Sequence, residues 1–146
     1  MKIFGAMMII FSIAACNEVV DCSRETKTTA RISFFKKTDG TSLVMAFDTI
    51  MAISSESVFF TAKDSANVYD LPLDPNVNST AFIFIKASVT DTLILGYENQ
   101  FVIIDEDCVP EIAFNNLEIL NTSFDSLRIV ENRLLIEVEN NIKIFL

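Results

Sequence analysis

The 146-residue chain contains no histidine and no tryptophan, and it has only three glycines, three prolines and three cysteines. The absence of histidine removes the usual general base at neutral pH, the histidine-dependent catalytic triads and the imidazole ligands of metal sites. Three glycines are too few for a glycine-rich phosphate loop. The aromatic residues are 13 phenylalanines, which suit a core, and only two tyrosines for a sugar platform. These absences predict a protein that is not an enzyme and that uses no cofactor.

Carboxylates are the remaining candidates for chemistry, and their pattern is not specific. Asp105-Glu106-Asp107 offers oxygens of the kind that bind Ca²⁺, but it lacks the alternating ligand spacing of a dedicated loop. We therefore favour a solvated acidic turn and predict no metal site. A hydrolase that uses carboxylates alone is a further alternative, because any two of the 20 acidic residues could supply the pair of a glycosidase.

The first 15 residues have the layout of a secretory signal peptide. Lys2 provides a short positive region, the apolar stretch 3–13 follows it, and Ala14 and Ala15 are small enough for a peptidase site. A membrane-spanning helix needs about 20 apolar residues, and this stretch is shorter.

The end of the stretch, Ile13-Ala14-Ala15-Cys16, resembles a bacterial lipobox. In such signals the cysteine thiol receives a diacylglycerol, cleavage falls just before it, and the new amine is usually acylated, as by palmitate. The resemblance implies lipidation at Cys16 and stable membrane anchoring by two or three chains. An ordinary signal peptide with a chance cysteine is the alternative. By analogy with enterobacterial sorting, Asn17 favours the outer membrane, and whether the domain faces the periplasm or the cell surface stays open.

Assigning Cys16 to lipid leaves Cys22 and Cys108 as one pair, in a compartment where disulfides persist. Both cysteines have polar flanks and do not resemble core side chains. We expect a Cys22–Cys108 disulfide, with two unpaired cysteines as the alternative. The bond would leave residues 17–21 as the free tether, which spans at most ~17 Å at about 3.4 Å per residue.

Removing residues 1–15 leaves 131 residues, enough for one domain, and changes the formal net charge from −9 to −10 because only Lys2 is lost. We expect a signal peptide at 1–15, the lipidated cysteine and a short tether at 16–27, and a single domain at 28–146. Half of the mature basic residues lie between Arg24 and Lys37. They could face anionic head groups, but a solvated strand edge is favoured. Because the mature chain carries a formal net charge of −10, it is expected to bind no nucleic acid.

Short runs of β-branched and aromatic residues, bounded by turn residues, predict strands throughout the domain. The runs are 31–35, 43–47, 58–60, 81–87, 93–95, 101–104, 127–130, 134–138 and 142–146. The last three predict a meander with a tight hairpin turn at Asn140-Asn141. Residues 96–100 are expected to separate two strands of a hairpin, and 70–79 to form a long loop. Residues 112–120 are ambiguous and fit either a strand or a short helical turn.

One of these runs, residues 81–85, is apolar on both faces, as expected of a strand between two layers. The whole pattern predicts an all-β fold: an antiparallel β-sandwich with Greek-key or meander connections, or a partly closed barrel.

Several segments also occur in a recognisable order. They are the lipobox cysteine, Asp21-Cys22, Thr28-Thr29 before the strand 31–35, Leu71-Pro72-Leu73, Tyr97, and Cys108 ahead of Phe114 and Leu117. This order resembles a domain-of-unknown-function family of small lipoproteins from Bacteroidetes-type bacteria. Ala30 and Val109 stand where that family has proline and glycine. The resemblance implies a compact β domain in the cell envelope and no particular activity.

The same lineage has a periplasmic O-glycosylation signal, in which Asp is followed by Ser or Thr and then by an apolar residue. Four matches give the candidate acceptors Thr49, Ser65, Thr92 and Ser126. Such dipeptides also mark turns that enter strands, which is the favoured interpretation.

Together these features predict a non-enzymatic, lipid-anchored envelope lipoprotein that binds or braces another envelope component, with a protein as the favoured partner. Edge strands of a β-sandwich can accept a partner strand. The alternative is a glycan- or lipid-binding module with a pocket between the sheets.

Overall fold

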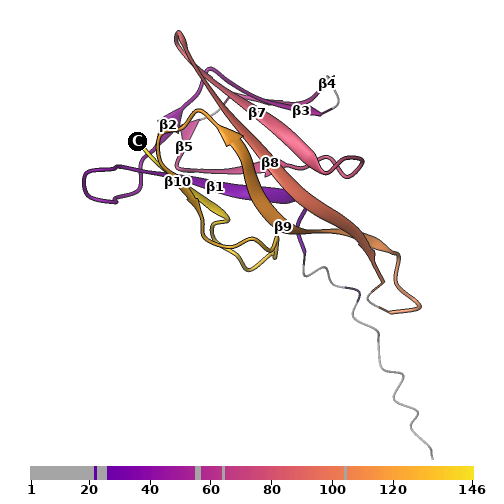
Figure 1. Cartoon of the computed structure of the whole chain (residues 1–146). Coiled ribbons are helices and arrows are strands. Elements are labelled where there is room, and N and C mark those ends of the chain that lie inside the picture. The colour runs from indigo at the N-terminus through magenta and orange to yellow at the C-terminus, as the bar shows by residue number, and fades with distance from the viewer. Residues whose placement is uncertain (1–21, 23–25, 55–56, 64, 104) are drawn as a thin grey trace, which may run out of the picture.

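The computed structural model describes residues 22, 26–54, 57–63, 65–103 and 105–146, and these form an all-β sandwich (Figure 1). The strands are β1 (Thr29–Phe35), β2 (Met45–Ala46), β3 (Thr49–Ser54), β4 (Ser57–Ala62), β5 (Ser65–Ala66), β6 (Val68–Pro72), β7 (Ser79–Lys86), β8 (Val89–Val102), β9 (Glu111–Thr122), β10 (Leu127–Ile129) and β11 (Ile142–Phe145). The described residues include no helix, and their sheets stay open. The predicted all-β sandwich is confirmed.

Two main sheets make the layers of the sandwich. The five-stranded sheet has the order β4-β3-β7-β8-β9 and is antiparallel throughout. The four-stranded sheet has the order β10-β11-β1-β6, and β2 and β5 form a small separate pair. Within the four-stranded sheet, β1 and β11 run parallel, with Ile32 opposite Ile142 and Phe35 opposite Phe145. This parallel pair departs from the predicted antiparallel pattern, and it joins the first and last strands of the domain.

The core lies between the sheets and is rich in phenylalanine. Successive side chains of a strand point to opposite faces, so Ile32 and Phe34 of β1 turn inward together. The Phe34 ring packs at centroid distances of 5.4 Å from Phe47, 6.3 Å from Phe84 and 6.2 Å from Phe124. These edge-to-face and tilted contacts join both sheets through one ring.

The predicted C-terminal meander is wrong in its middle strand. β10 pairs directly with β11, and residues 134–138 form no strand but part of the connection between them. Asn141 is fully buried, so Asn140-Asn141 is not an exposed hairpin turn. The Asn141 side chain accepts a hydrogen bond from the backbone N–H of Arg31 (3.0 Å) and donates to the carbonyls of Glu131 and Arg133 (3.1 and 3.0 Å). These long-range bonds, which no local pattern reveals, fold the connection back over β1.

The predicted hairpin turn at residues 96–100 is also wrong, because those residues lie inside the long strand β8. Tyr97 turns into the core, and its hydroxyl donates to the carbonyl of Asp74 (2.8 Å) and lies 2.7 Å from the Thr80 hydroxyl. Burial raises the pKa of Tyr97. The buried tyrosine holds the connection after β6 against the sheet.

Two further predictions need correction. Residues 112–120 belong to β9, so the short helical turn is wrong, and Asn116 has a φ of 53° where the pairing of β8 and β9 is irregular. The loop predicted at 70–79 is shorter, because β6 ends at Pro72 and β7 begins at Ser79.

Candidate interaction surfaces and the attachment of the tether

A disulfide joins Cys22 to Cys108, with 5.7 Å between their Cα atoms. The predicted pairing is confirmed. Cys108 lies in the connection between β8 and β9, so the bond ties the start of the described chain to the end of that hairpin. Cys16, the predicted lipidation site, lies outside the described residues, and so does the predicted signal peptide.

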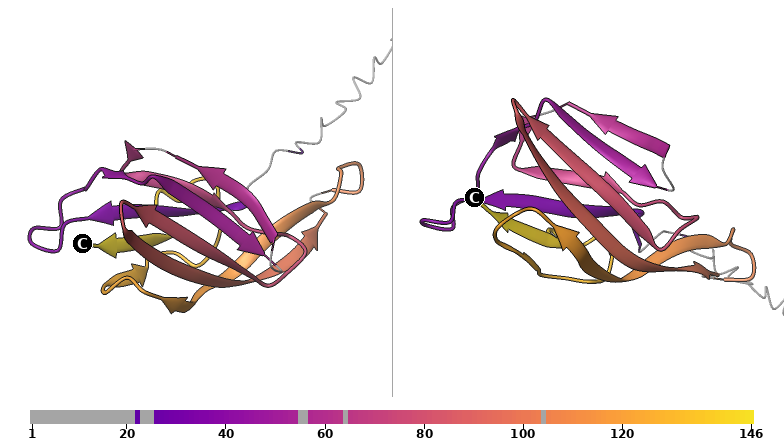
Figure 2. Two further views of the ribbon diagram at one scale, coloured as in Figure 1. Left: turned by 90° about the horizontal axis from the view of Figure 1, so that it is seen from above. Right: turned by 45° about the horizontal axis from the view of Figure 1, so that its top comes forward.

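The end of the β8–β9 hairpin extends beyond the rest of the sandwich, at the end of the molecule opposite the C-terminus (Figure 2). We call residues 99–103 and 105–112 the prong. Phe101 is 79% exposed, Ile103 is 63% exposed and Val109 is 81% exposed. Phe101 and Ile112 are direct cross-strand partners at its base. The prong therefore presents apolar side chains to its surroundings beside the disulfide.

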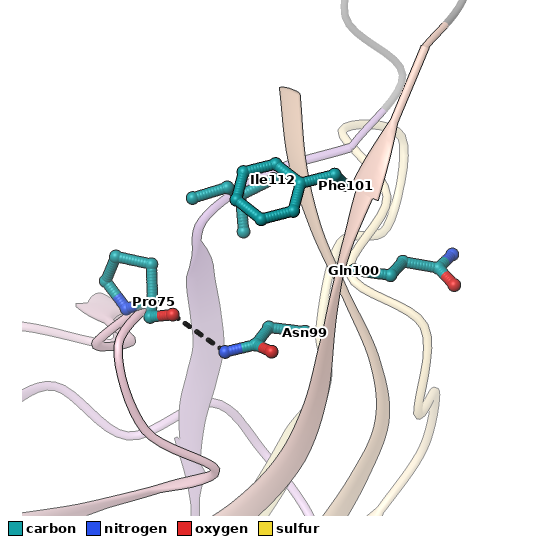
Figure 3. A pocket seen from close by; sticks show the side chains of 5 residues that line it. All are labelled: Pro75, Asn99, Gln100, Phe101 and Ile112. Carbon is teal, nitrogen blue, oxygen red and sulfur yellow. Dashed lines mark hydrogen bonds between the residues drawn. The ribbon is translucent and has the colours of Figure 1, made fainter. Parts of the chain in front are cut away.

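A small pocket lies at the base of the prong, between it and the connection after β6 (Figure 3). Asn99 donates hydrogen bonds to the carbonyls of Pro75 (2.7 Å) and Val77 (3.3 Å) and so links the two segments. The pocket has a volume of ≈ 40 Å³, whereas pockets for small organic ligands measure roughly 300 Å³ or more. It does not support the alternative of a ligand pocket between the sheets.

The outer face of the five-stranded sheet carries a group of aliphatic side chains, with Thr92 opposite Ile83 and Thr49 opposite Ile85 on the same face. We call the outward side chains Met51, Ile53, Ile83, Ile85 and Ile94 the aliphatic face. They come from the neighbouring strands β3, β7 and β8, and each is half-buried. They alternate with buried core residues, so they point away from the core. The expectation that residues 81–85 lie between two layers therefore holds only for their inward side chains, and Ile83 is on an outer surface.

The aliphatic face continues toward β9. Leu120 is 53% exposed, and the Leu120 and Glu118 side chains lie over Gly96, where an added Cβ would come within 2.9 Å of Glu118 Cγ. Glycine at this position lets those two side chains approach the sheet closely. The aliphatic surface thus spans four adjacent strands before it meets the carboxylate of Glu118.

The outer face of the four-stranded sheet is charged instead. Arg31 and Asp70 pair through two hydrogen bonds of 2.8 Å, which lower the pKa of the Asp70 carboxyl. Lys143 lies over the Phe35 ring at 4.9 Å from its centroid, and Arg128 lies over the ring of Phe145. The two outer faces of the sandwich therefore differ in chemistry.

Of the basic residues predicted to cluster between Arg24 and Lys37, only Arg31 lies within a strand of this sheet, and the two described next contact connections. Lys27 donates to the carbonyl of Val138 (3.2 Å), and burial lowers the pKa of its ammonium group. Lys37 pairs with Asp125 at 3.4 Å. Arg24 lies outside the described residues. These contacts hold connections against the sheet.

The four candidate glycosylation acceptors are scattered. Thr49 begins β3, Thr92 lies within β8, Ser65 begins β5, and Ser126 precedes β10. Among them, only Ser65 is on an exposed position. Glycosylation stays a prediction at each.

Two of the associated aspartates have structural roles. Asp48 accepts a hydrogen bond from the backbone N–H of Ala87 (2.6 Å), at the turn between β7 and β8. Asp91 accepts one from the hydroxyl of Ser123 (2.8 Å). Both aspartates therefore hold neighbouring connections in place, which agrees with the favoured turn interpretation.

The acidic run 105–107 closes a turn, in which the Asp107 N–H donates to the Asp105 carboxylate (3.1 Å). Across the described residues, no group of three acidic or cysteine side chains is placed to hold a metal ion. The same part of the chain has no helix long and apolar enough to cross a membrane.

A family model described as a family of unknown function, DUF6452, matches residues 48–146, more than half of the chain. The chain belongs to the DUF6452 family. The DUF6452 match contains the aliphatic face, the prong and Cys108, and it begins after β1 and Cys22. The expected membership in a domain-of-unknown-function family is confirmed, whereas lipoprotein character and bacterial lineage stay predictions. No match was found among curated proteins or among solved structures.

Proposed function

We propose that this DUF6452 protein is a non-enzymatic, lipid-anchored component of a bacterial cell envelope that binds another envelope protein through its aliphatic face. The observation that carries the proposal is the set of aliphatic side chains on three neighbouring strands, all turned away from the core. Contiguous apolar surface of this kind marks interaction sites in soluble domains. The lipobox-like end of the first 16 residues supplies the anchor, with the outer membrane as the expected location.

The chemistry of the aliphatic face favours a protein as the partner. Its five defining side chains carry neither charge nor hydrogen-bonding groups, which glycan recognition requires. The formal charge of −10 on the mature chain opposes binding to the phosphates of nucleic acid. An open sheet face is instead matched by the apolar face of a second sheet, which packs at about 10 Å in sandwiches. The partner is therefore expected to present a flat apolar surface.

The test is photo-crosslinking in intact cells of the source bacterium, followed by detergent extraction. A photoreactive phenylalanine analogue replaces Ile83 on the aliphatic face. The matched control carries it at Val68, a half-buried outward position on β6 in the opposite sheet. We expect one reproducible product with a second envelope protein from position 83 and none from position 68. Recovery of the free monomer alone from both positions would refute the proposal, and a product with twice the mass of the chain would identify a second copy as the occupant.

Mass spectrometry of the extracted protein tests the anchor separately. The mature chain is expected to begin at Cys16 and to carry a diacylglycerol and an acyl group. A different N-terminus, or no added lipid mass at Cys16, would refute the anchoring part of the proposal whatever the crosslink gives.

A further inference from the structure

We infer that the prong lies in the head-group layer of the bilayer that carries the lipid anchor, with Phe101 and its apolar neighbours in contact with lipid. This inference rests on the anchor of the proposed function and adds an orientation to it. It assigns the two ends of the sandwich different surroundings: lipid at the prong and water at the C-terminus.

The first argument is distance. The disulfide fixes Cys22 to Cys108, and Cys108 is part of the prong. Only residues 17–21 then separate the lipidated Cys16 from Cys22, and the distance between the two cysteines is at most about 20 Å at about 3.4 Å per residue. The prong is therefore the part of the sandwich that the anchor holds nearest to the membrane. The C-terminus lies at the opposite end of the molecule (Figure 2).

The second argument is the chemistry of the prong. Of the described phenylalanine side chains, Phe101 alone is exposed, and Ile103 and Val109 are exposed beside it. Such exposed apolar groups would gain from transfer out of water. Cross-strand pairing with Ile112 places a second apolar side chain beside Phe101. The apolar groups thus lie where the tether would bring lipid within reach.

The acidic turn determines how deeply the prong enters the bilayer and which lipid head groups it contacts. Asp105, Glu106 and Asp107 lie between Ile103 and Val109, and carboxylates are costly in the hydrocarbon core but cost little near the interface. The prong therefore stays in the head-group layer. The carboxylates are repelled by anionic lipids and attracted to the ammonium groups of phosphatidylethanolamine, so a zwitterionic surface is the matching one.

Tryptophan fluorescence tests the inference, because the chain has no tryptophan of its own. The lipidated Phe101→Trp variant is reconstituted into phosphatidylethanolamine–phosphatidylcholine vesicles and floated with them. The matched control is Val89→Trp. The Val89 side chain is 59% exposed, and it lies about 40 Å along β8 from position 101 at about 3.3 Å per residue. Quenching by brominated acyl chains and by aqueous iodide is measured for both.

We expect position 101 to emit at shorter wavelength than position 89, to be quenched by brominated lipid and to be protected from iodide. Replacing part of the zwitterionic lipid with phosphatidylglycerol is expected to reduce the lipid quenching. A Cys22→Ser/Cys108→Ser background is expected to reduce it as well, because the tether then no longer ends at the prong.

The opposing outcomes are distinct. Flotation with iodide quenching at position 101 equal to that at 89 overturns the inference and leaves the anchor standing. Protection from iodide without quenching by brominated lipid also overturns it, since a protein surface then covers the prong. Absence of flotation together with absence of lipid mass at Cys16 refutes the anchor itself, and the inference falls with it.

Discussion

The side chain of Asn141 binds the backbone of Arg31 across 110 residues of sequence, with its carbonyl oxygen 3.0 Å from the Arg31 nitrogen. The backbones of the two residues are also paired, because the Asn141 N–H donates to the Arg31 carbonyl (2.9 Å). This contact continues the parallel pairing of β1 and β11 and draws the connection 130–141 over the end of the sheet. A single buried amide thus forms hydrogen bonds with three backbone groups, those of Arg31, Glu131 and Arg133.

Asn141→Ala is expected to destabilise the protein by roughly 1–3 kcal/mol, because it removes the hydrogen-bond partner of three partly buried backbone groups. Asn132→Ala is the matched control, since Asn132 lies in the same connection but is exposed. It should change the free energy of unfolding by no more than about 0.5 kcal/mol. Urea denaturation followed by circular dichroism measures both values. Equal effects of the two substitutions would contradict the structural role of Asn141.

Ala87→Gly is expected to stabilise the protein by about 0.5–1 kcal/mol. Ala87 has a φ of 53° in the two-residue turn between β7 and β8, a region that disfavours side chains and that glycine adopts freely. The neighbouring substitution Ser88→Gly is the control, because Ser88 does not have a positive φ and gains no such relief. Thermal unfolding of both variants gives the comparison, and a lower melting temperature for Ala87→Gly than for the wild type would refute the prediction.

Removing the disulfide is expected to reduce stability by about 4.5 kcal/mol in the chain-entropy model, because the bond closes a separation of 86 residues. The double variant Cys22→Ser/Cys108→Ser avoids a stray thiol, and its denaturant midpoint is compared with that of the oxidised wild type. Reduced wild-type protein should match the double variant. If reduction had no effect on the midpoint, the bond would contribute nothing to the folded state.

The Arg31–Asp70 pair is expected to make stability depend on pH. The pKa of Asp70 in the folded protein is lowered from 3.8 by hydrogen bonds from Arg31, so the unfolded chain takes up the proton first as the pH falls. The stabilisation is therefore complete above about pH 4–5 and is lost as the pH drops through the folded-state pKa. Because Asp70 is 43% exposed, solvent screening limits the effect to at most about 1 kcal/mol.

Asp70→Asn should therefore lower the free energy of unfolding at pH 7. At pH 3 the difference in this free energy from the wild type should be smaller. The control is Asp107→Asn, at an exposed position in the prong. Chemical denaturation at the two pH values measures the difference. A penalty for Asp70→Asn that is as large at pH 3 as at pH 7 would show that charge pairing is not its cause.

Ile83→Asn is expected to leave the fold intact, because the side chain is outside the core, and to abolish the proposed partner contact. Phe82→Ala is the contrasting substitution, because the neighbouring Phe82 ring is fully buried. It should lower the free energy of unfolding by about 3–5 kcal/mol. The fraction of the chain crosslinked from a photoreactive group at Ile85, measured with and without Ile83→Asn, tests the contact. Unchanged crosslinking in the folded Ile83→Asn variant would exclude this face as the docking surface.

Local patterns in the sequence determined the class of the fold. The predicted runs 31–35 and 81–87 lie within a few residues of β1 and β7, because β-branched and aromatic side chains suit a pleated surface. The pairing of Cys22 with Cys108 also followed from counting cysteines once Cys16 was assigned to lipid. These features depend on residue type and spacing, which the chain displays directly.

Tertiary contacts decided the rest. Residues 96–100 look like a turn, but Tyr97 is buried and β8 continues through them, because the hydroxyl of Tyr97 finds partners on Thr80 and Asp74. Residues 134–138 look like a strand, but β11 pairs directly with β10 on one side and with β1 on the other. No place is therefore left between β10 and β11 for a middle strand of a meander. Pairing between distant segments depends on which surfaces meet in the folded chain, and periodicity within one segment carries no information about its partner.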